Sequence, residues 1–306
     1  MAKIEVENFT KDYGFNRGVF NISFKIEQGE VYGFLGPNGA GKSTTIRHLM
    51  GFSKPDKGKT KILGLDSFEN YYNFMDKVGY LPGEIALPDG LNGYEFLDMM
   101  KNLKHIKDDT YTKYLIQLFK LDPSGETKRM SLGVKRKLAI VTAFMNDPEI
   151  LILDEPTSGL DLEMQETFIE FIKSEKKRGK TILLSSHIFS EVDATCDRIA
   201  IIKDGKIVSE FVANDLKHNN NKNYIIEFES ENEKQKFIER NKAVEKFSII
   251  ENNKDNLIVN IDDVNINNLI KEISKSKIKS FNQLKETLED YFMKYYKEDK
   301  DFKGVD

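Results

Sequence analysis

The sequence predicts an α/β fold with a mostly parallel sheet, joined to a second, smaller α+β unit. Two observations carry this prediction. Short apolar segments alternate with helical segments between residues 149 and 202, an order typical of a parallel sheet with helices on both faces. The composition then changes near residue 214, where the polar, Asn-rich stretch NDLKHNNNKN begins a different kind of sequence.

The bulk composition indicates a soluble globular protein and argues against a nucleic-acid-binding, a disulfide-linked or a membrane-spanning protein. The 306 residues are 39% hydrophobic and 31% charged, which allows a sizeable core and two domains. A net charge of −4 does not favour nucleic acid as a partner, because a nucleic-acid-binding face is strongly basic. The single cysteine, Cys196, permits no internal disulfide and indicates a reducing compartment. Apolar runs such as 150–153 are far shorter than the roughly 20 residues of a membrane span.

The elements of the first 215 residues follow from apolar patterning and turn signals. We expect a helix-rich stretch between about 93 and 146, and a hairpin turn at Asp204 and Gly205. The predicted strands are 4–9, 19–26, 30–35, 60–63, 77–82, 149–154, 180–186 and 197–202. One helix is predicted to begin at Lys42, and two others are predicted at 162–178 and 188–195.

The region after the Asn-rich stretch is predicted to be a ferredoxin-like βαββαβ unit. Its predicted strands are Tyr224–Glu229, Phe247–Glu251 and Leu257–Ile261; one helix face holds Ile266, Leu269, Ile270 and Ile273, and another holds Leu284, Leu288, Tyr291, Phe292 and Tyr295. The predicted organisation is a first domain at 1–215, a linker at 216–222, a second domain at 223–297 and a disordered tail at 298–306.

The segment GPNGAGKST lies between a predicted strand and a predicted helix. Glycines let backbone N–H groups turn around phosphate oxygens, and the helix start adds its positive dipole end. Lys42 is expected to bridge the β- and γ-phosphates, and Ser43 to place its hydroxyl on Mg²⁺. A chance match in a Gly-rich turn is the alternative, and the strand–loop–helix context favours nucleotide binding. The predicted nucleotide-binding residues are Gly36, Pro37, Asn38, Gly39, Ala40, Gly41, Lys42, Ser43 and Thr44.

Two carboxylates, Asp154 and Glu155, end the buried strand in EILILDEPTSGLD. Open parallel sheets bind ligands at the carboxyl ends of their strands. Asp154 is therefore expected to hold Mg²⁺, and Glu155 to polarise an attacking water. Taken alone, two acids that simply end a strand are an equally good interpretation. The phosphate loop earlier in the chain favours the catalytic one.

Over roughly residues 2–215 the chain resembles the ATP-binding subunits of ABC transporters. The resemblance implies that Tyr13, in KDYG, stacks on adenine, with a packed strand-end tyrosine as the alternative. It implies that the loop ending at Asp161 touches the opposite subunit. His187, in LLSSHIFSE, matches the family's switch histidine, which contacts the γ-phosphate; a lone histidine after a strand is otherwise usually structural.

The stretch MSLGVKRKL resembles the family's LSGGQ signature, followed by a basic helix. Ser131 and Gly133 are kept, whereas Leu132 and Val134 replace a glycine and the glutamine. In the family this loop completes the ATP site of the other subunit, head to tail. The serine hydroxyl, the glycine and the helix N-terminus can still serve a phosphate, which predicts a divergent but working signature. The alternative is a degenerate site that depends on a partner subunit.

A second departure lies after the predicted strand 77–82, where the family usually has a glutamine. Here the sequence is YLPGE, with Gly83 at that position and Glu84 next. In the family this glutamine senses Mg²⁺ and the membrane subunit. That Glu84 takes over part of this contact is a hypothesis, and an exposed loop glutamate is the alternative. The segment LKETLEDYFMKYY resembles the end of the extra domain in exporter ATPases of the bacitracin-resistance kind, with a generic amphipathic helix as its alternative.

The resemblance implies an ATP hydrolase with ATP and Mg²⁺ as cofactors. It implies a head-to-tail pair of ATPase subunits, identical or different, and a separate transmembrane permease of an exporter for peptide antibiotics, drugs or lipids. The chain would then be cytoplasmic and peripheral on the inner face of the membrane. One rival is a soluble ABC ATPase that acts on ribosomes or DNA. The other is a module that senses ATP without turnover.

Overall fold

The chain forms two units in the computed structural model of the protein, Met1–Ala213 and Asn214–Asp306. The structure describes residues 2–217, 221–241, 247–253, 256–284 and 287–297. The predicted tail at 298–306 lies outside these residues.

A six-stranded sheet is the centre of the first unit, with strand order β10-β9-β3-β8-β7-β6. Every pair from β9 to β6 is parallel, and β10 is antiparallel to β9. The residues of β3, β7 and β8 are buried throughout, which explains their continuous apolar runs. The strands are β3 (Val31–Leu35), β6 (Val78–Leu81), β7 (Ile150–Asp154), β8 (Thr181–Ser186), β9 (Arg198–Lys203) and β10 (Lys206–Val212).

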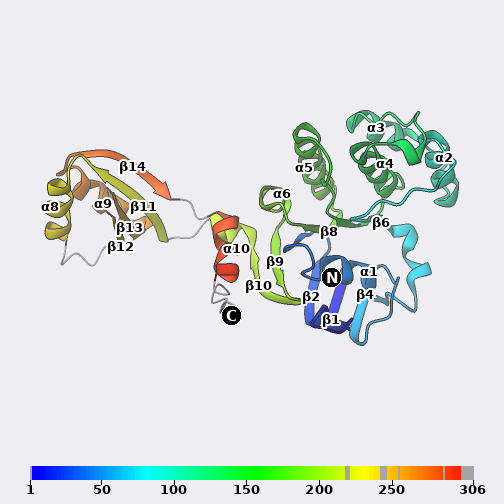
Figure 1. Ribbon diagram of the computed structural model, residues 1–306, viewed down its shortest axis with the longest axis horizontal. Helices are drawn as coiled ribbons and strands as arrows, with labels where there is room; N and C mark the ends of the chain where they lie inside the picture. Colours follow the sequence, from blue (N-terminus) through cyan, green and yellow to red (C-terminus); the bar gives the residue numbers. More distant parts are fainter. Residues whose placement is uncertain (1, 218–220, 242–246, 254–255, 285–286, 298–306) are drawn as a thin grey trace, which may run out of the picture. The chain divides into compact units, whose positions relative to one another are not determined.

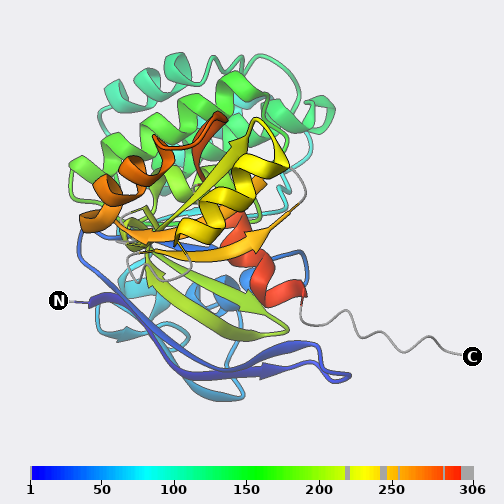
Figure 2. The same ribbon diagram turned by 90° about the vertical axis from the view of Figure 1, so that its left-hand side faces the viewer.

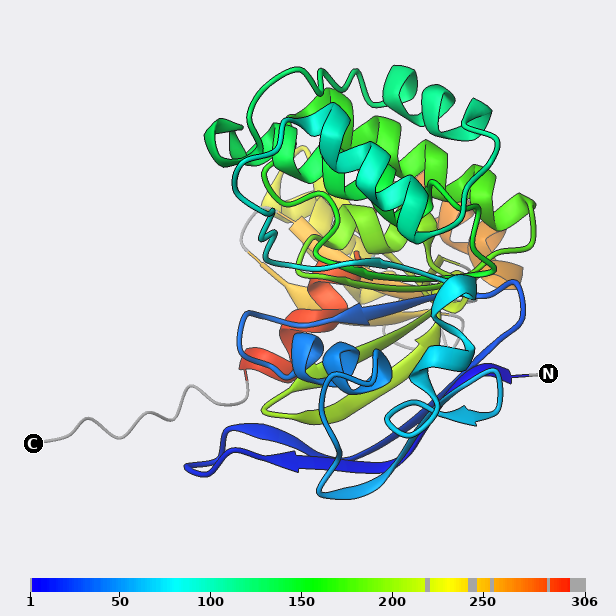
Figure 3. The ribbon, with the colours of Figure 1, turned by 90° about the vertical axis from the view of Figure 1, so that its right-hand side faces the viewer.

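A second sheet of this unit is antiparallel, with strand order β2-β1-β4-β5. Its strands are β1 (Ala2–Asp12), β2 (Gly18–Glu27), β4 (Lys57–Ile62) and β5 (Leu65–Asp66). Helix α1 (Lys42–Leu49) lies between the two sheets (Figure 3). Its Ile46 and Leu49 belong to one buried core with Phe9 of the antiparallel sheet and Phe34 of the parallel sheet. This core fixes the start of α1 at the edge where the parallel strands end.

The remaining helices of the unit lie across the parallel sheet from α1 (Figures 1 and 3). They are α2 (Gly93–Leu103), α3 (Thr110–Leu118), α4 (Leu132–Phe144), α5 (Leu162–Lys177) and α6 (Phe189–Thr195). Short helical turns occur at η1 (Tyr71–Asn73), η2 (Met75–Lys77) and η3 (Thr127–Arg129), and α7 (Ala213–Lys217) begins at the last residue of the unit. Among the described residues, none of the helices has the length and apolar character of a membrane span.

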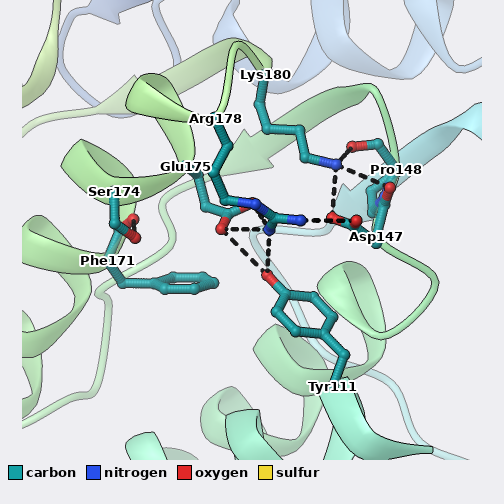
Figure 4. Close-up of polar contacts among 8 residues, drawn as sticks. All are labelled: Tyr111, Asp147, Pro148, Phe171, Ser174, Glu175, Arg178 and Lys180. Carbon is teal, nitrogen blue, oxygen red and sulfur yellow. Dashed lines mark hydrogen bonds and ion pairs between the residues drawn. The ribbon is translucent and has the colours of Figure 1, made fainter.

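A polar cluster lies where β7 and β8 begin, at the opposite ends from Asp154 and Ser186 (Figure 4). Lys180, just before β8, donates to the carbonyl oxygens of Asp147 (2.8 Å) and Pro148 (2.6 Å), just before β7. Arg178 joins the Asp147 carboxylate (2.7 Å) to the buried carboxylate of Glu175 at the end of α5. These contacts fasten α5 to the amino ends of both strands.

The second unit has the element order βαββαβ followed by a helix, which confirms the predicted ferredoxin-like arrangement (Figure 2). Its antiparallel sheet has strand order β12-β13-β11-β14. The elements are β11 (Asn221–Phe228), α8 (Glu231–Asn241), β12 (Ser248–Asn252), β13 (Asn256–Asp262), η4 (Asp263–Asn265), α9 (Ile266–Ile273), β14 (Ile278–Leu284) and α10 (Leu288–Lys297). Alternate residues of β11 and β13 pack on Phe237 of α8 and Leu269 of α9, so both helices cover one face of the sheet.

Two predictions for this unit need correction. Leu284 is not on the last helix; it ends β14 and pairs with Asn223 of β11. Leu284 lies four residues before Leu288, a spacing that would place both on one face of a helix. In the structure, however, Leu284 is part of a strand. Strand β11 begins at Asn221, inside the predicted linker 216–222.

Candidate nucleotide-binding site

The predicted site residues follow four neighbouring strands at one edge of the parallel sheet. Gly36 follows β3, Glu155 follows β7, His187 follows β8 and Gly83 comes shortly after β6. Because β3, β8, β7 and β6 are adjacent and parallel, their carboxyl ends bring these loops together. Sheet topology alone therefore gathers residues that are far apart in the sequence.

The phosphate loop curls around the side chain of Lys42. Gly41 has a φ of 111°, in the region that favours glycine, and directly precedes α1. The Lys42 ammonium is buried and donates to the carbonyl oxygens of Gly36 (2.5 Å) and Pro37 (3.2 Å). The loop therefore holds a cation at a helix N-terminus, as phosphate binding requires. Along the loop, Gly36 and Ala40 are buried, Gly41 and Thr44 are half-buried, and Pro37, Asn38, Gly39 and Ser43 are exposed.

Glu155 lies between Lys42 and His187. Its Oε1 is 3.0 Å from Lys42 Nζ, and its Oε2 is 2.6 Å from His187 Nδ1. Its backbone has a φ of 50°, a strained conformation for a residue with a side chain. The structure thus places the predicted water-polarising carboxylate between the phosphate-loop lysine and the predicted switch histidine.

Asp154 is buried beside Glu155, and the Ser185 hydroxyl donates to its Oδ1. A Cβ atom added to Gly83 would come within 3.0 Å of Asp154 Oδ2, so the loop after β6 lies directly against this carboxylate. Mg²⁺ in nucleotide sites is typically bound by one or two carboxylates together with substrate phosphates and waters. Asp154 supplies one such carboxylate, and Ser43 is exposed at the start of α1. These donors fit the predicted magnesium site.

Tyr13 lies in the turn between β1 and β2, and its side chain is 55% exposed. Lys11 Nζ lies 5.7 Å from the centre of its ring. The structure therefore presents an accessible ring and not the packed strand-end tyrosine of the alternative. Stacking on adenine stays a prediction.

The signature residues lie at the start of α4. The Ser131 hydroxyl accepts a hydrogen bond from Val134 N (3.3 Å) and caps the helix, and Ser131 is exposed. A Cβ atom on Gly133 would lie 3.0 Å from the carbonyl oxygen of Gly159. Within the described part of the chain, no hydrogen bond or ion pair joins Ser131 or Gly133 to Lys42. Whether Ser131 and Gly133 serve another subunit's nucleotide stays a prediction.

Asp161 has a structural role that the sequence reasoning did not assign. Its Oδ1 accepts a hydrogen bond from Met164 N (2.9 Å), so Asp161 caps α5. Glu84 is exposed, and its suggested contact with Mg²⁺ or a partner stays a hypothesis.

Three polar residues of the site were missed in the sequence. Arg136 of α4 is buried and donates to carbonyl groups of the loops after β6 and β7. The Ser186 hydroxyl donates to the buried Glu191 carboxyl (2.5 Å) on α6, and burial raises the pKa of Glu191 to about 7. One signal was available, because Ser186 and Glu191 flank His187 closely in SSHIFSE.

Comparison with known proteins identifies the family of this chain. A family model described as "ABC transporter" matches residues 19–158. The bacitracin transport ATP-binding protein BcrA of Bacillus licheniformis is 36% identical over 231 residues, which cover 74% of each chain. The Nod factor export ATP-binding protein I of Burkholderia lata is 34% identical over 219 residues, covering 69% of this chain and 71% of that protein. A solved ATP-binding subunit of an ABC transporter has a TM-score of 0.63 at 28% identity, covering 70% of this chain and 91% of its own.

The chain therefore belongs to the family of ABC transporter ATP-binding proteins, and its first unit has the ABC ATPase fold. The sequence-based prediction of the family, including its likeness to the bacitracin branch, is confirmed.

Proposed function

We propose that this protein hydrolyses ATP to drive a separate membrane permease of an exporter. The observation that carries the catalytic part is the position of Glu155 between Lys42 and His187. A carboxylate in that position can orient and polarise a water molecule while the lysine faces the phosphates. The half-exposed His187 can reach both Glu155 and a γ-phosphate.

Each residue of the site has a distinct part in this proposal. The phosphate loop and Lys42 hold the β- and γ-phosphates, and Tyr13 stacks on the adenine. Glu155 accepts a proton from the attacking water, and His187 donates a hydrogen bond to the transferred phosphoryl group. Asp154 and Ser43 would hold Mg²⁺, which when bound would neutralise charge on the phosphates.

The proposed assembly contains two ATPase subunits, head to tail, with Ser131 and Gly133 of each facing the nucleotide of the other. The exposed position of Ser131 at the start of α4 supports this arrangement. The names of the relatives, a bacitracin transport protein and a Nod factor export protein, support export as the process. Peptide antibiotics, drugs and lipids remain the proposed substrate classes, and the proposed location is the inner face of the membrane, bound to the permease.

ATP hydrolysis by the purified chain and by Glu155→Gln tests the catalytic part. We expect Mg²⁺-dependent hydrolysis that falls about 100-fold or more in Glu155→Gln, because general-base catalysis typically contributes 10²–10⁴-fold. Glu149→Gln is the matched control, since Glu149 is an exposed glutamate just before β7. Equal rates for the parent and Glu155→Gln would contradict the proposal and favour a module that senses ATP without turnover.

Co-expression with the product of a neighbouring gene that encodes several membrane-length apolar segments tests the permease part. We expect the two proteins to copurify and the rate of ATP hydrolysis to change on binding. A chain that copurifies with ribosomes or DNA instead would favour the soluble ABC ATPase.

A further inference from the structure

We propose that Arg136 is a positioning residue for ATP hydrolysis, which holds the loops after β6 and β7 against α4 and so sets the place of Asp154. This inference rests on the proposed function, because it assigns Arg136 a part in that same site. Arg136 lies in α4, five residues after Ser131, and is not one of the signature residues.

The guanidinium of Arg136 makes three hydrogen bonds to backbone carbonyl groups. Its Nη1 donates to Pro82 O (2.8 Å) and its Nη2 to Gly83 O (2.6 Å), both in the loop after β6. Its Nε donates to Ser158 O (3.0 Å), in the loop after β7. One side chain of α4 therefore fixes two loops that the sequence separates widely.

Arg136 is 1% exposed, so its charge has been removed from water. Burial lowers its pKa, and the nearby carboxylates of Asp154, Glu155 and Glu191 favour its charged form. A buried charge is costly unless it is hydrogen-bonded, and here each of the three guanidinium nitrogens donates to a backbone carbonyl group. Such a residue holds its surroundings in one arrangement, because any displacement of α4 leaves buried donors without acceptors.

Each loop held by Arg136 contacts one of the two acidic residues of the site, the loop after β6 at the Asp154 carboxylate and the loop after β7 at the backbone of Glu155. The Gly83 backbone lies so close to Asp154 that an added Cβ would come within 3.0 Å of Oδ2. Ser158 N donates to the carbonyl oxygen of Glu155 (3.2 Å). A shift of either loop therefore moves a group that contacts Asp154 or Glu155. Gly83 has no side chain, so its own position is held through backbone contacts such as the hydrogen bond from Arg136 Nη2 to its carbonyl oxygen.

Lysine cannot replace Arg136 in this role. The planar guanidinium offers five donors in a fixed fork, whereas an ammonium is a point charge on a flexible stem. Arg136→Lys keeps the positive charge near Asp154 but cannot hold three separate carbonyl groups with the same geometry. It therefore separates positioning from simple charge compensation.

Lys180 provides a matched control for the loss of a buried cation. It is 8% exposed and also donates to two backbone carbonyl groups, but at the amino ends of β7 and β8 (Figure 4). Lys180→Met should destabilise the first unit by a mechanism similar to that of Arg136→Met, because both remove a buried cation. Its distance from the carboxyl ends of these strands should leave the nucleotide site unchanged.

The experiment compares the parent chain with Arg136→Met, Arg136→Lys and Lys180→Met. Circular dichroism first verifies that each variant is folded. The first readout is the kcat of ATP hydrolysis. The second is the Kd for a fluorescent ATP analogue, measured in the Glu155→Gln background with excess Mg²⁺ and with EDTA. The ratio of these two Kd values reports how well Asp154 is placed to bind Mg²⁺ with the nucleotide, independently of turnover.

We expect kcat to fall about tenfold or more in both Arg136 variants, since small misplacements of catalytic groups can cost up to 100-fold. We also expect the effect of Mg²⁺ on nucleotide affinity to shrink in both, with affinity in EDTA unchanged. Lys180→Met should match the parent in both readouts, although its melting temperature should be lower.

Arg136 variants that match the parent in kcat and in the Mg²⁺ effect would overturn the proposal, as would an equal loss in Lys180→Met. Should Arg136→Met not fold, Arg136→Lys decides in the same way. If the parent hydrolyses no ATP, the proposed function fails, whereas the Mg²⁺ effect on nucleotide affinity still decides the role of Arg136.

Discussion

His187 Nδ1 lies 2.6 Å from Glu155 Oε2, so the residue after β8 shares a hydrogen bond with the residue after β7. The other oxygen of Glu155 lies 3.0 Å from Lys42 Nζ. The carboxylate is thereby oriented from two sides, and each of its oxygens has a different neighbour. This arrangement makes distinct predictions for the histidine and for the groups around it.

Replacement of His187 by alanine should reduce turnover without weakening nucleotide binding. We expect kcat to fall by about 10²–10³, because in the proposed mechanism His187 orients Glu155 and donates a hydrogen bond to the transferred phosphoryl group. The Kd for ATP should change less than about threefold, because the phosphate loop and Lys42 remain. Steady-state kinetics and equilibrium binding measure the two quantities.

His105→Ala is the control for this replacement, since His105 is an exposed histidine after α2. If His187→Ala and His105→Ala have the same kcat, His187 has no part in hydrolysis.

Glu191→Gln should make the protein more stable than the parent at neutral pH. Burial raises the pKa of Glu191 from 4.5 to about 7, so the folded chain holds a proton that the unfolded chain has lost. The contribution of Glu191 to stability is therefore fully present below pH 4.5 and is lost as pH rises toward 7. At pH 8 the loss amounts to about 3 kcal/mol, at 1.36 kcal/mol per pKa unit.

The free energy of unfolding of the parent and of Glu191→Gln, measured by denaturant titration at pH 5 and pH 8, checks this prediction. We expect the free energy of unfolding of the variant, relative to that of the parent, to be higher at pH 8 than at pH 5. A difference between the two proteins that does not change with pH would show that Glu191 titrates alike in the folded and unfolded chains.

Phe237→Ala should unfold the second unit and leave nucleotide binding intact. Phe237 is fully buried among Tyr224, Ile226 and Leu269, and phenylalanine-to-alanine changes in cores cost about 3–5 kcal/mol. The first unit has a separate core, so ATP affinity should stay at the parent's value.

Hydrogen exchange of α8 and β13, together with ATP binding, measures both effects of Phe237→Ala. Phe15→Ala is the control, because Phe15 is 99% exposed. Lost ATP binding in Phe237→Ala would mean that the two units do not fold independently.

The parts of the fold that could be predicted from sequence are those where the backbone demands particular residues. The continuous apolar runs of β7 and β8 require burial on both faces, and the glycines before Lys42 permit a conformation that other residues avoid. Helix α8 has few apolar residues, among them Phe237 and Ile238, too few for a clear helical period. The bounds of β14 could not be predicted, because Leu284 and Leu288 share a helical spacing.

The residues of the site also fall into those that could be predicted from sequence and those that could not. Lys42, Asp154 and Glu155 could be predicted as site residues, because phosphate and metal chemistry restricts the residue types at a fixed spacing. Arg136 was missed because its burial depends on the loops after β6 and β7, which only the folded chain brings to α4. The strained backbone of Glu155 was also invisible, since a φ of 50° is a tertiary result and not a property of glutamate.

The measurement that tests the central claim most directly is the mass in solution of Glu155→Gln with and without ATP. Blocked hydrolysis should trap the closed pair in which Ser131 and Gly133 face the nucleotide of the other subunit. We predict a monomer without ATP and a dimer with ATP. A monomer that binds ATP would contradict the account, because MSLGVKRKL would then fail to complete an ATP site between two copies of this chain.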